Sequence, residues 1–162
     1  MDKYLELYKK NMVLDDMFAS KYSDDEQLYE KNCLEFVVEV GELANESKCF
    51  KYWSIKKPNR DNLLEEYADC LLMNLYFFNE YKIKDIGFIT SDNDEDILVL
   101  FNELIRMCTL LMDRDNVTKE LLLNIFSKLL RLGKLLEFKD EEIISSCYNK
   151  IKKNEERLNS DY

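Results

Sequence analysis

Apolar residues recur every three or four positions along most of the chain, which is the spacing of one face of an α-helix. Short polar segments interrupt this pattern, and Pro58 lies in one of them. Residues 23–26 and 59–61 are typical of helix starts, because their side chains can accept hydrogen bonds from free backbone amides. The pattern predicts an all-α protein with about six helices, near residues 2–20, 26–48, 61–82, 94–113, 117–136 and 140–158.

Composition narrows the class of protein further. The 162 residues contain no repeat, low-complexity tract or linker, so we expect a single domain over residues 1–162. Acidic residues outnumber basic ones by 33 to 23, and the net charge of -10 argues against binding to nucleic acid or to an anionic membrane. No apolar run approaches the roughly 18 residues of a membrane span, and residues 1–6 lack a signal-peptide core.

The chain has 5 scattered cysteines and no histidine. The absence of histidine argues strongly against a zinc site of the usual Cys/His kind. It also excludes a catalytic triad with histidine and leaves carboxylates as the acid–base groups. An odd number of separated cysteines is typical of free thiols in a reducing compartment. We therefore expect a cytoplasmic protein.

Two acid pairs, Glu39/Glu42 and Glu66/Asp69, lie within apolar helical sequence. Residues three apart share a helix face, and an ionised carboxylate among valines and leucines is costly unless it is paired or binds a cation. The same spacing at 92/95 and 137/140 falls at loops or helix ends, where acids are common. The alternative is that each acid pair lies on a solvated helix face and bonds to a nearby lysine. This alternative accounts well for a single pair and less well for two pairs in apolar sequence.

The two pairs have matching positions on either side of the connecting segment. Glu42 and Glu66 each lie roughly 8–9 Å from the turn, at 1.5 Å of helix per residue. If these helices form an antiparallel hairpin, the pairs meet. The predicted stripe of Glu35, Glu39, Glu42 and Glu46 contains no lysine to neutralise it. Oxygen ligands alone suit Mg²⁺ or Mn²⁺ and predict chemistry on phosphate esters or anhydrides.

Gly41 lies in the middle of the same predicted helix. A glycine there costs about 1 kcal/mol relative to alanine. It indicates the close approach of another backbone or a ligand, and the alternative is that glycine is simply tolerated.

With these acid pairs, the sequence resembles the all-α nucleoside triphosphate pyrophosphatases, the MazG-like superfamily, whose signature is E-x-x-E followed by E-x-x-D on two facing helices. It is most similar to the dimeric dUTPase family, whose bacterial members resemble residues 38–54 and 64–69 almost residue for residue. The resemblance implies a helical bundle of that type, a homodimer, and metal ligation by Glu39, Glu42, Glu66 and Asp69. Glu39 and Glu42 are the candidate catalytic residues, with Glu39 helping to deprotonate the attacking water.

The resemblance also implies a phosphate-binding row on the last helix. The family carries Lys-x-x-x-Asn-x-x-Arg there, which corresponds to Lys150, Asn154 and Arg157, although Leu158 follows where many members have Gln. Ammonium, amide and guanidinium groups all donate to phosphate oxygens. Lys51, in the connecting segment, is a further candidate for phosphate binding. A solvated amphipathic helix is the alternative for the terminal row.

For the base, the resemblance points to the first helix, where the family has a Gln-containing motif followed by Asp or Asn. Asn11 and Asp15 take the similar place, and asparagine offers the same amide on a shorter stem. Trp53 is a candidate for stacking on the base, and the alternative is that it anchors its loop to the core. Base selectivity therefore follows less directly from the sequence than the reaction does.

Together with the acid pairs, the resemblance implies an Mg²⁺-dependent homodimer that hydrolyses dUTP to dUMP and pyrophosphate. Two alternatives stay open. One is a related all-α pyrophosphatase that acts on another nucleotide such as dCTP. The other is a catalytically silent helical dimer that binds a protein partner, in which the acids are remnants.

Overall fold

The computed structural model describes residues 2–87 and 96–160, and this part of the chain is helical with no strand. The all-α prediction is therefore confirmed, with bounds that differ by a few residues. The acid pair at 92/95 and the first two residues of the predicted helix 94–113 lie outside the described residues. The elements are α1 (Asp2–Lys21), α2 (Leu28–Ser47), α3 (Arg60–Glu80), α4 (Ile97–Leu110), the 3-10 turn η1 (Arg114–Asn116), α5 (Lys119–Leu135) and α6 (Asp140–Asn159).

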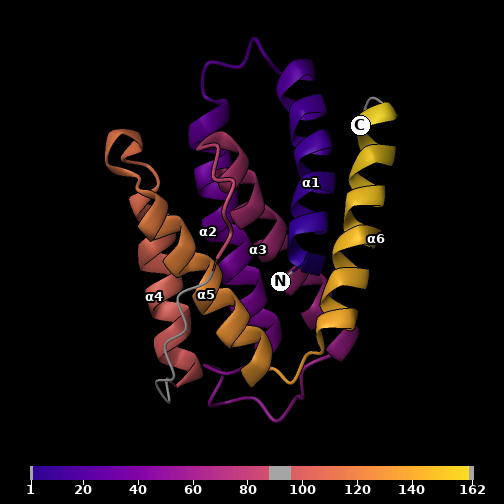
Figure 1. Cartoon of the computed structure of the whole chain (residues 1–162). Coiled ribbons are helices and arrows are strands. Elements are labelled where there is room, and N and C mark those ends of the chain that lie inside the picture. Colours follow the sequence, from indigo (N-terminus) through magenta and orange to yellow (C-terminus); the bar gives the residue numbers. More distant parts are fainter. Residues whose placement is uncertain (1, 88–95, 161–162) are drawn as a thin grey trace.

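Helix α3 is the centre of the bundle, because it packs against α1, α2, α5 and α6, while α4 packs on α2 and α5 (Figure 1). The long connecting segment after α2 turns the chain back, so α2 and α3 lie side by side and antiparallel. The core between the helices is rich in aromatic side chains. Among its buried aromatic residues are Phe77, Phe78, Phe101 and Phe126.

Helix ends explain where the observed bounds depart from the predicted ones. The Asn59 side chain caps α3 by accepting hydrogen bonds from the amides of Asp61 and Asn62, at 3.0 and 3.1 Å. Helix α2 begins two residues later than predicted. The carboxylate of Asp25 accepts from the amide of Gln27 at 3.0 Å, which forms a turn before the helix rather than its cap.

The packing of α5 on α3 depends on Gly133. A Cβ added there would lie 2.7 Å from the hydroxyl oxygen of Tyr67, which is fully buried and donates to the carbonyl of Leu129 at 2.8 Å. We expect Gly133→Ala to destabilise the protein by about 1–3 kcal/mol, because neither partner has room to move. In a chain of this size that lowers the melting temperature by about 2–4 °C per kcal/mol.

The matched control for that substitution is Lys134→Ala, at the exposed neighbouring position. Thermal unfolding followed by circular dichroism measures both variants. An unchanged melting temperature for Gly133→Ala would contradict the close contact with Tyr67.

Candidate functional site

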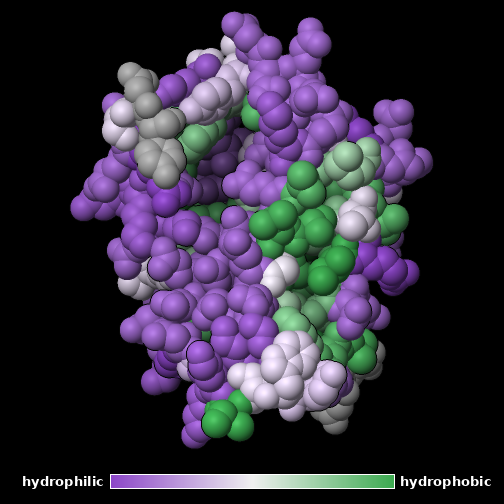
Figure 2. Space-filling model, turned by 180° about the vertical axis from the view of Figure 1, so that it is seen from behind, coloured by the Kyte–Doolittle hydropathy of each residue, from purple (hydrophilic) through white to green (hydrophobic). Residues whose placement is uncertain are grey.

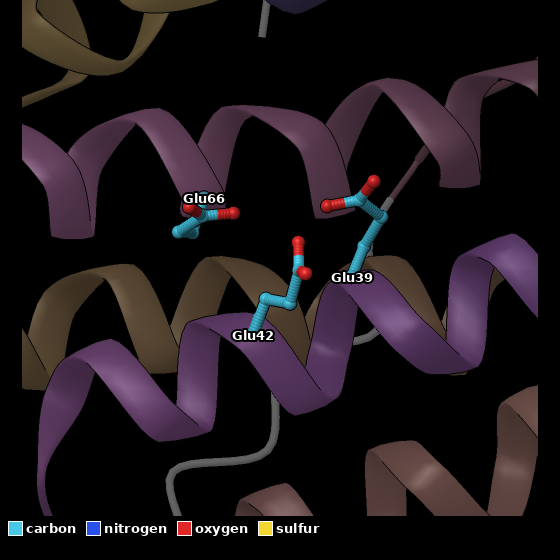
Figure 3. A group of neighbouring side chains, drawn as sticks. All are labelled: Glu39, Glu42 and Glu66. Carbon is cyan, nitrogen blue, oxygen red and sulfur yellow. The ribbon is translucent and has the colours of Figure 1, made fainter.

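Three of the four predicted acids meet where α2 faces α3. Carboxylate oxygens of Glu39 and Glu42 on α2 and Glu66 on α3 all lie within 4.8 Å of one another. Figure 3 shows the side chains of Glu39 and Glu42 extending from α2 toward Glu66 on the neighbouring helix. Three like charges at this separation repel one another unless protons or a cation compensate them.

Glu39 carries most of this electrostatic cost. Burial, then the charges of Asp69 and Glu42, raise the pKa of Glu39 to about 8. Its oxygen Oε2 is buried and has no hydrogen-bond partner among the residues that the structure describes. Burial, then Glu42, likewise raise the pKa of Glu66. An unsatisfied carboxylate oxygen beside two more carboxylates fits a hard divalent cation, which prefers oxygen ligands.

Asp69, the fourth predicted acid, lies beside this group rather than in it. The Nζ of Lys150, on α6, is 2.6 Å from Oδ2 of Asp69, and both side chains are largely buried. Burial raises the pKa of Asp69, and the hydrogen bond from Lys150 opposes that shift. For Lys150, burial disfavours the charged form, but its bond to Asp69 and the nearby charges of Glu65 and Glu39 outweigh burial and raise its pKa.

The predicted phosphate-binding row on α6 therefore begins next to the acids, at Lys150. Farther along the same helix, Arg157 donates a long hydrogen bond of 3.5 Å to the side-chain oxygen of Asn154. The charge of Arg157 opposes a part of the rise in the pKa of Asp69 that burial causes. The ammonium, amide and guanidinium groups expected from the sequence therefore follow one side of the site.

A cavity of about 270 Å³ lies between α1, α2, α3 and α6. Asn11, Asp15 and Asn154 are among the residues that line it, together with Glu35. Glu35 is one helical turn before Glu39, and the charge of Asp69 contributes to raising its pKa, after burial. The cavity therefore adjoins the acid cluster, and Asn11 and Asp15, one turn apart on α1, both line it.

Comparison with known protein families agrees with this geometry. A family model described as dUTPase matches residues 3–162. The chain belongs to the dUTPase family. It is a hydrolase, a dUTP diphosphatase that converts dUTP to dUMP and pyrophosphate, and dUTPases generally depend on a divalent metal. No curated protein matches the sequence as a relative.

In this dUTPase, two of the predicted site residues, Lys51 and Trp53, are not among the residues that line the cavity. Trp53 is 64% exposed in the segment after α2, and its ring packs edge-on against Tyr52, with centroids 5.0 Å apart. Lys51 donates to the side-chain oxygen of Asn45 at 2.5 Å. The segment follows the C-terminal end of α2. The cavity is bordered by the C-terminal half of α1, which lies beside the other end of α2 (Figure 1).

The structure also adds cavity residues that were not predicted for this dUTPase, namely Phe18, Asn32, Glu35, Met73 and Tyr76. For two of these residues the sequence contains a signal. Phe18 is seven residues after Asn11, on the same helix face, and Glu35 belongs to the acidic stripe of Glu39.

Among the described helices, none combines the length and the apolarity needed to cross a bilayer.

Proposed function

We propose that this dUTPase is a homodimer that uses Mg²⁺, with Mn²⁺ as a substitute, held by Glu39, Glu42, Glu66 and Asp69. The observation that carries the metal site is the convergence of three carboxylates around an unsatisfied oxygen of Glu39. Donor sets made only of oxygen suit these ions. A divalent ion bound there supplies Lewis-acid chemistry to the triphosphate.

The protein side chains divide the remaining work. Glu39 is the proposed group that takes a proton from the attacking water, because its carboxylate lies in the acid cluster with Glu42 and Glu66. The positively charged Lys150 and Arg157, with the amide of Asn154, donate to the phosphate oxygens. Their charge stabilises the negative charge that develops as the phosphoanhydride bond breaks.

The cavity is the proposed place of the base, with Asn11 and Asp15 at its edge. Deoxyribose then lies between the base and the acids, because the cavity adjoins Glu39 through Glu35. Contacts of Lys51 with phosphate and of Trp53 with the base belong to the same proposal, and they require the connecting segment to approach the bound nucleotide.

Pyrophosphate release from a panel of deoxynucleoside triphosphates tests the proposal, with Mg²⁺, with Mn²⁺ and with a chelator. We expect turnover of dUTP that depends on the added metal and exceeds turnover of the other nucleotides. Turnover of dCTP or dTTP as fast as dUTP would favour a pyrophosphatase of broader specificity. Activity that persists in chelator would contradict the metal site.

The proposed dimer interface is an apolar stripe on α2. Leu34 and Val38 are 63% and 47% exposed, and Gly41 continues the same stripe, one further turn along. A Cβ added at Gly41 would meet no atom within 4 Å, so space is open there for another helix. Figure 2 shows hydrophobic residues gathered in a band on the side where α4 lies, on a face that is otherwise hydrophilic. Exposed apolar bands of this kind mark interaction surfaces.

We expect the double variant Leu34→Asp/Val38→Asp to be monomeric, because paired charges in an apolar interface are left without solvent or partners. Light scattering after size-exclusion chromatography measures the mass of each variant. Ile55→Asp is the control, since Ile55 is fully exposed in the connecting segment. A wild type that is itself monomeric, or a double variant that stays dimeric, would contradict this interface.

A further inference from the structure

The cavity beside the acids contains one fixed polar pair. Asn11, only 3% exposed, donates from Nδ2 to the two carboxyl oxygens of Asp15, at 3.2 and 3.1 Å, and to the backbone carbonyl of Leu72 at 3.4 Å. The two side chains are one turn apart on α1, so the helix itself sets their separation. Most of the remaining wall is apolar or aromatic, formed by Leu14, Phe18, Leu72, Met73 and Tyr76.

No cation compensates Asp15 within this cavity. Lys31 is the one cationic residue among the described residues that line it, and its Nζ is paired with Asp25 at 2.5 Å. Burial, then the charge of Asp16, raise the pKa of Asp15 to about 8, and a hydrogen bond from Asn79 opposes part of that shift. Near pH 7 the carboxyl group of Asp15 is therefore mostly neutral.

The groups that face Asp15 from the other helices do not favour its ionised form either. The side chain from α6 that reaches the cavity, Asn154, is uncharged. The titratable groups near Asp15 or lining the cavity are Tyr8 and Asp16 on α1, Tyr22 just after α1, Lys31 and Glu35 on α2, and Tyr76 on α3. Apart from the paired lysine they are acids and phenols, so none of them favours an ionised Asp15.

A neutral carboxylic acid matches the edge of uracil in a way that a carboxylate does not. Uracil presents an N3–H donor between two carbonyl acceptors. A protonated carboxyl group can donate its O–H to a carbonyl and accept from N3–H through its other oxygen. An ionised carboxylate has acceptors only, so it keeps one of these hydrogen bonds and sets a negative charge against the carbonyl.

We propose that Asp15 is a specificity-determining residue that binds the uracil edge as a neutral carboxylic acid, and that dUTP binding weakens when Asp15 ionises. This inference rests on the proposed function, in which the cavity takes the base. Asn11 holds the two oxygens of Asp15 in place, so the acid needs no reorganisation of its heavy atoms to form both bonds.

The test compares kcat and KM for dUTP in the wild type and in Asp15→Asn between pH 7 and 9.5, at saturating Mg²⁺. In the wild type we expect KM to rise about tenfold from pH 7 to pH 9, because only the protonated fraction binds. In Asp15→Asn we expect the tenfold rise in KM between pH 7 and pH 9 to be absent, since an amide keeps its donor at every pH. Ionisation of the uracil or of Glu39 affects both proteins equally and cancels in this comparison.

Asp16→Asn provides a second, independent variant outside the cavity. Removing the charge of Asp16 lowers the pKa of Asp15, so the rise in KM is expected to begin at a lower pH than in the wild type. A rise that persists unchanged in Asp15→Asn, or that does not move in Asp16→Asn, would overturn the inference while leaving the dUTPase assignment intact. A wild type without metal-dependent dUTP turnover at any pH would instead contradict the proposed function.

Discussion

Replacing Glu39 with glutamine is expected to reduce kcat/KM for dUTP by about a thousandfold, the range associated with loss of a general base or of a metal ligand. The same change is expected to stabilise the metal-free protein. Glutamine keeps the size of the side chain, removes its charge and can donate to the nearby carboxylates of Glu42 and Glu66. One substitution therefore separates catalysis from folding stability.

The pH dependence gives the sign of the stability effect. The pKa of Glu39 is raised from 4.5 to about 8 in the folded protein, so the folded state binds an extra proton between these values. Stability of the wild type therefore falls as pH rises through this range, while Glu39→Gln lacks this contribution. We expect the variant to melt a few degrees above the wild type at pH 8, at about 2–4 °C per kcal/mol, with a much smaller difference at pH 4.5.

Differential scanning fluorimetry with chelator present, together with the pyrophosphate assay, measures both effects. Glu30→Gln is the matched control, because Glu30 is an exposed acid near the start of the same helix. A Glu39→Gln protein that is less stable than the wild type at pH 8 would mean that Glu39 is already compensated without a metal.

The second large effect is expected from Lys150→Met, which leaves Asp69 without its ammonium partner. Removing one member of a buried ion pair typically costs about 3–5 kcal/mol. Asp69 can reduce that cost by taking up a proton, since burial already raises its pKa. We expect about 2 kcal/mol of destabilisation at pH 8, or about 4–8 °C in melting temperature, and about a hundredfold loss in kcat/KM for dUTP.

This loss of stability is expected to shrink as pH falls, because a protonated Asp69 needs no cation. Without Lys150 the pKa of Asp69 rises further, so the folded variant binds its proton over a wider range and loses more stability toward high pH. Lys153→Met is the control, as Lys153 is more exposed on the same helix and pairs with Glu65 at 2.7 Å. Equal effects of the two substitutions would remove any special role for Lys150.

The meeting of the acid pairs was predictable because it depends on local helix geometry. Glu42 and Glu66 have similar positions relative to the connecting segment, and the antiparallel arrangement of α2 and α3 brings them to the same depth. The pairing of Asp69 with Lys150 was not predictable in the same way. It depends on how α6 docks on α3, and no spacing within either helix encodes that.

The surroundings of the predicted base-binding residues were also not predictable from the sequence. Asn11 and Asp15 could be assigned to one helix face, but the cavity in front of them exists because α2, α3 and α6 complete it. For Trp53, the family resemblance and its place between the acid pairs indicated an aromatic side chain near the site. The aromatic neighbours that hold its ring, Phe50 and Tyr52, belong to the same short segment, so local contacts decide its position.

Three different faces of helix α2 are constrained, and this limits how its sequence can vary. One side contributes Phe36 and Val40 to the core, a second carries Glu39 and Glu42, and a third is the apolar stripe that begins at Leu34. Few of the 20 positions of α2 are then free of all three constraints. In a mutational scan α2 would stand out as the least tolerant helix, and variation among natural relatives would concentrate elsewhere, for example on the exposed side of α5.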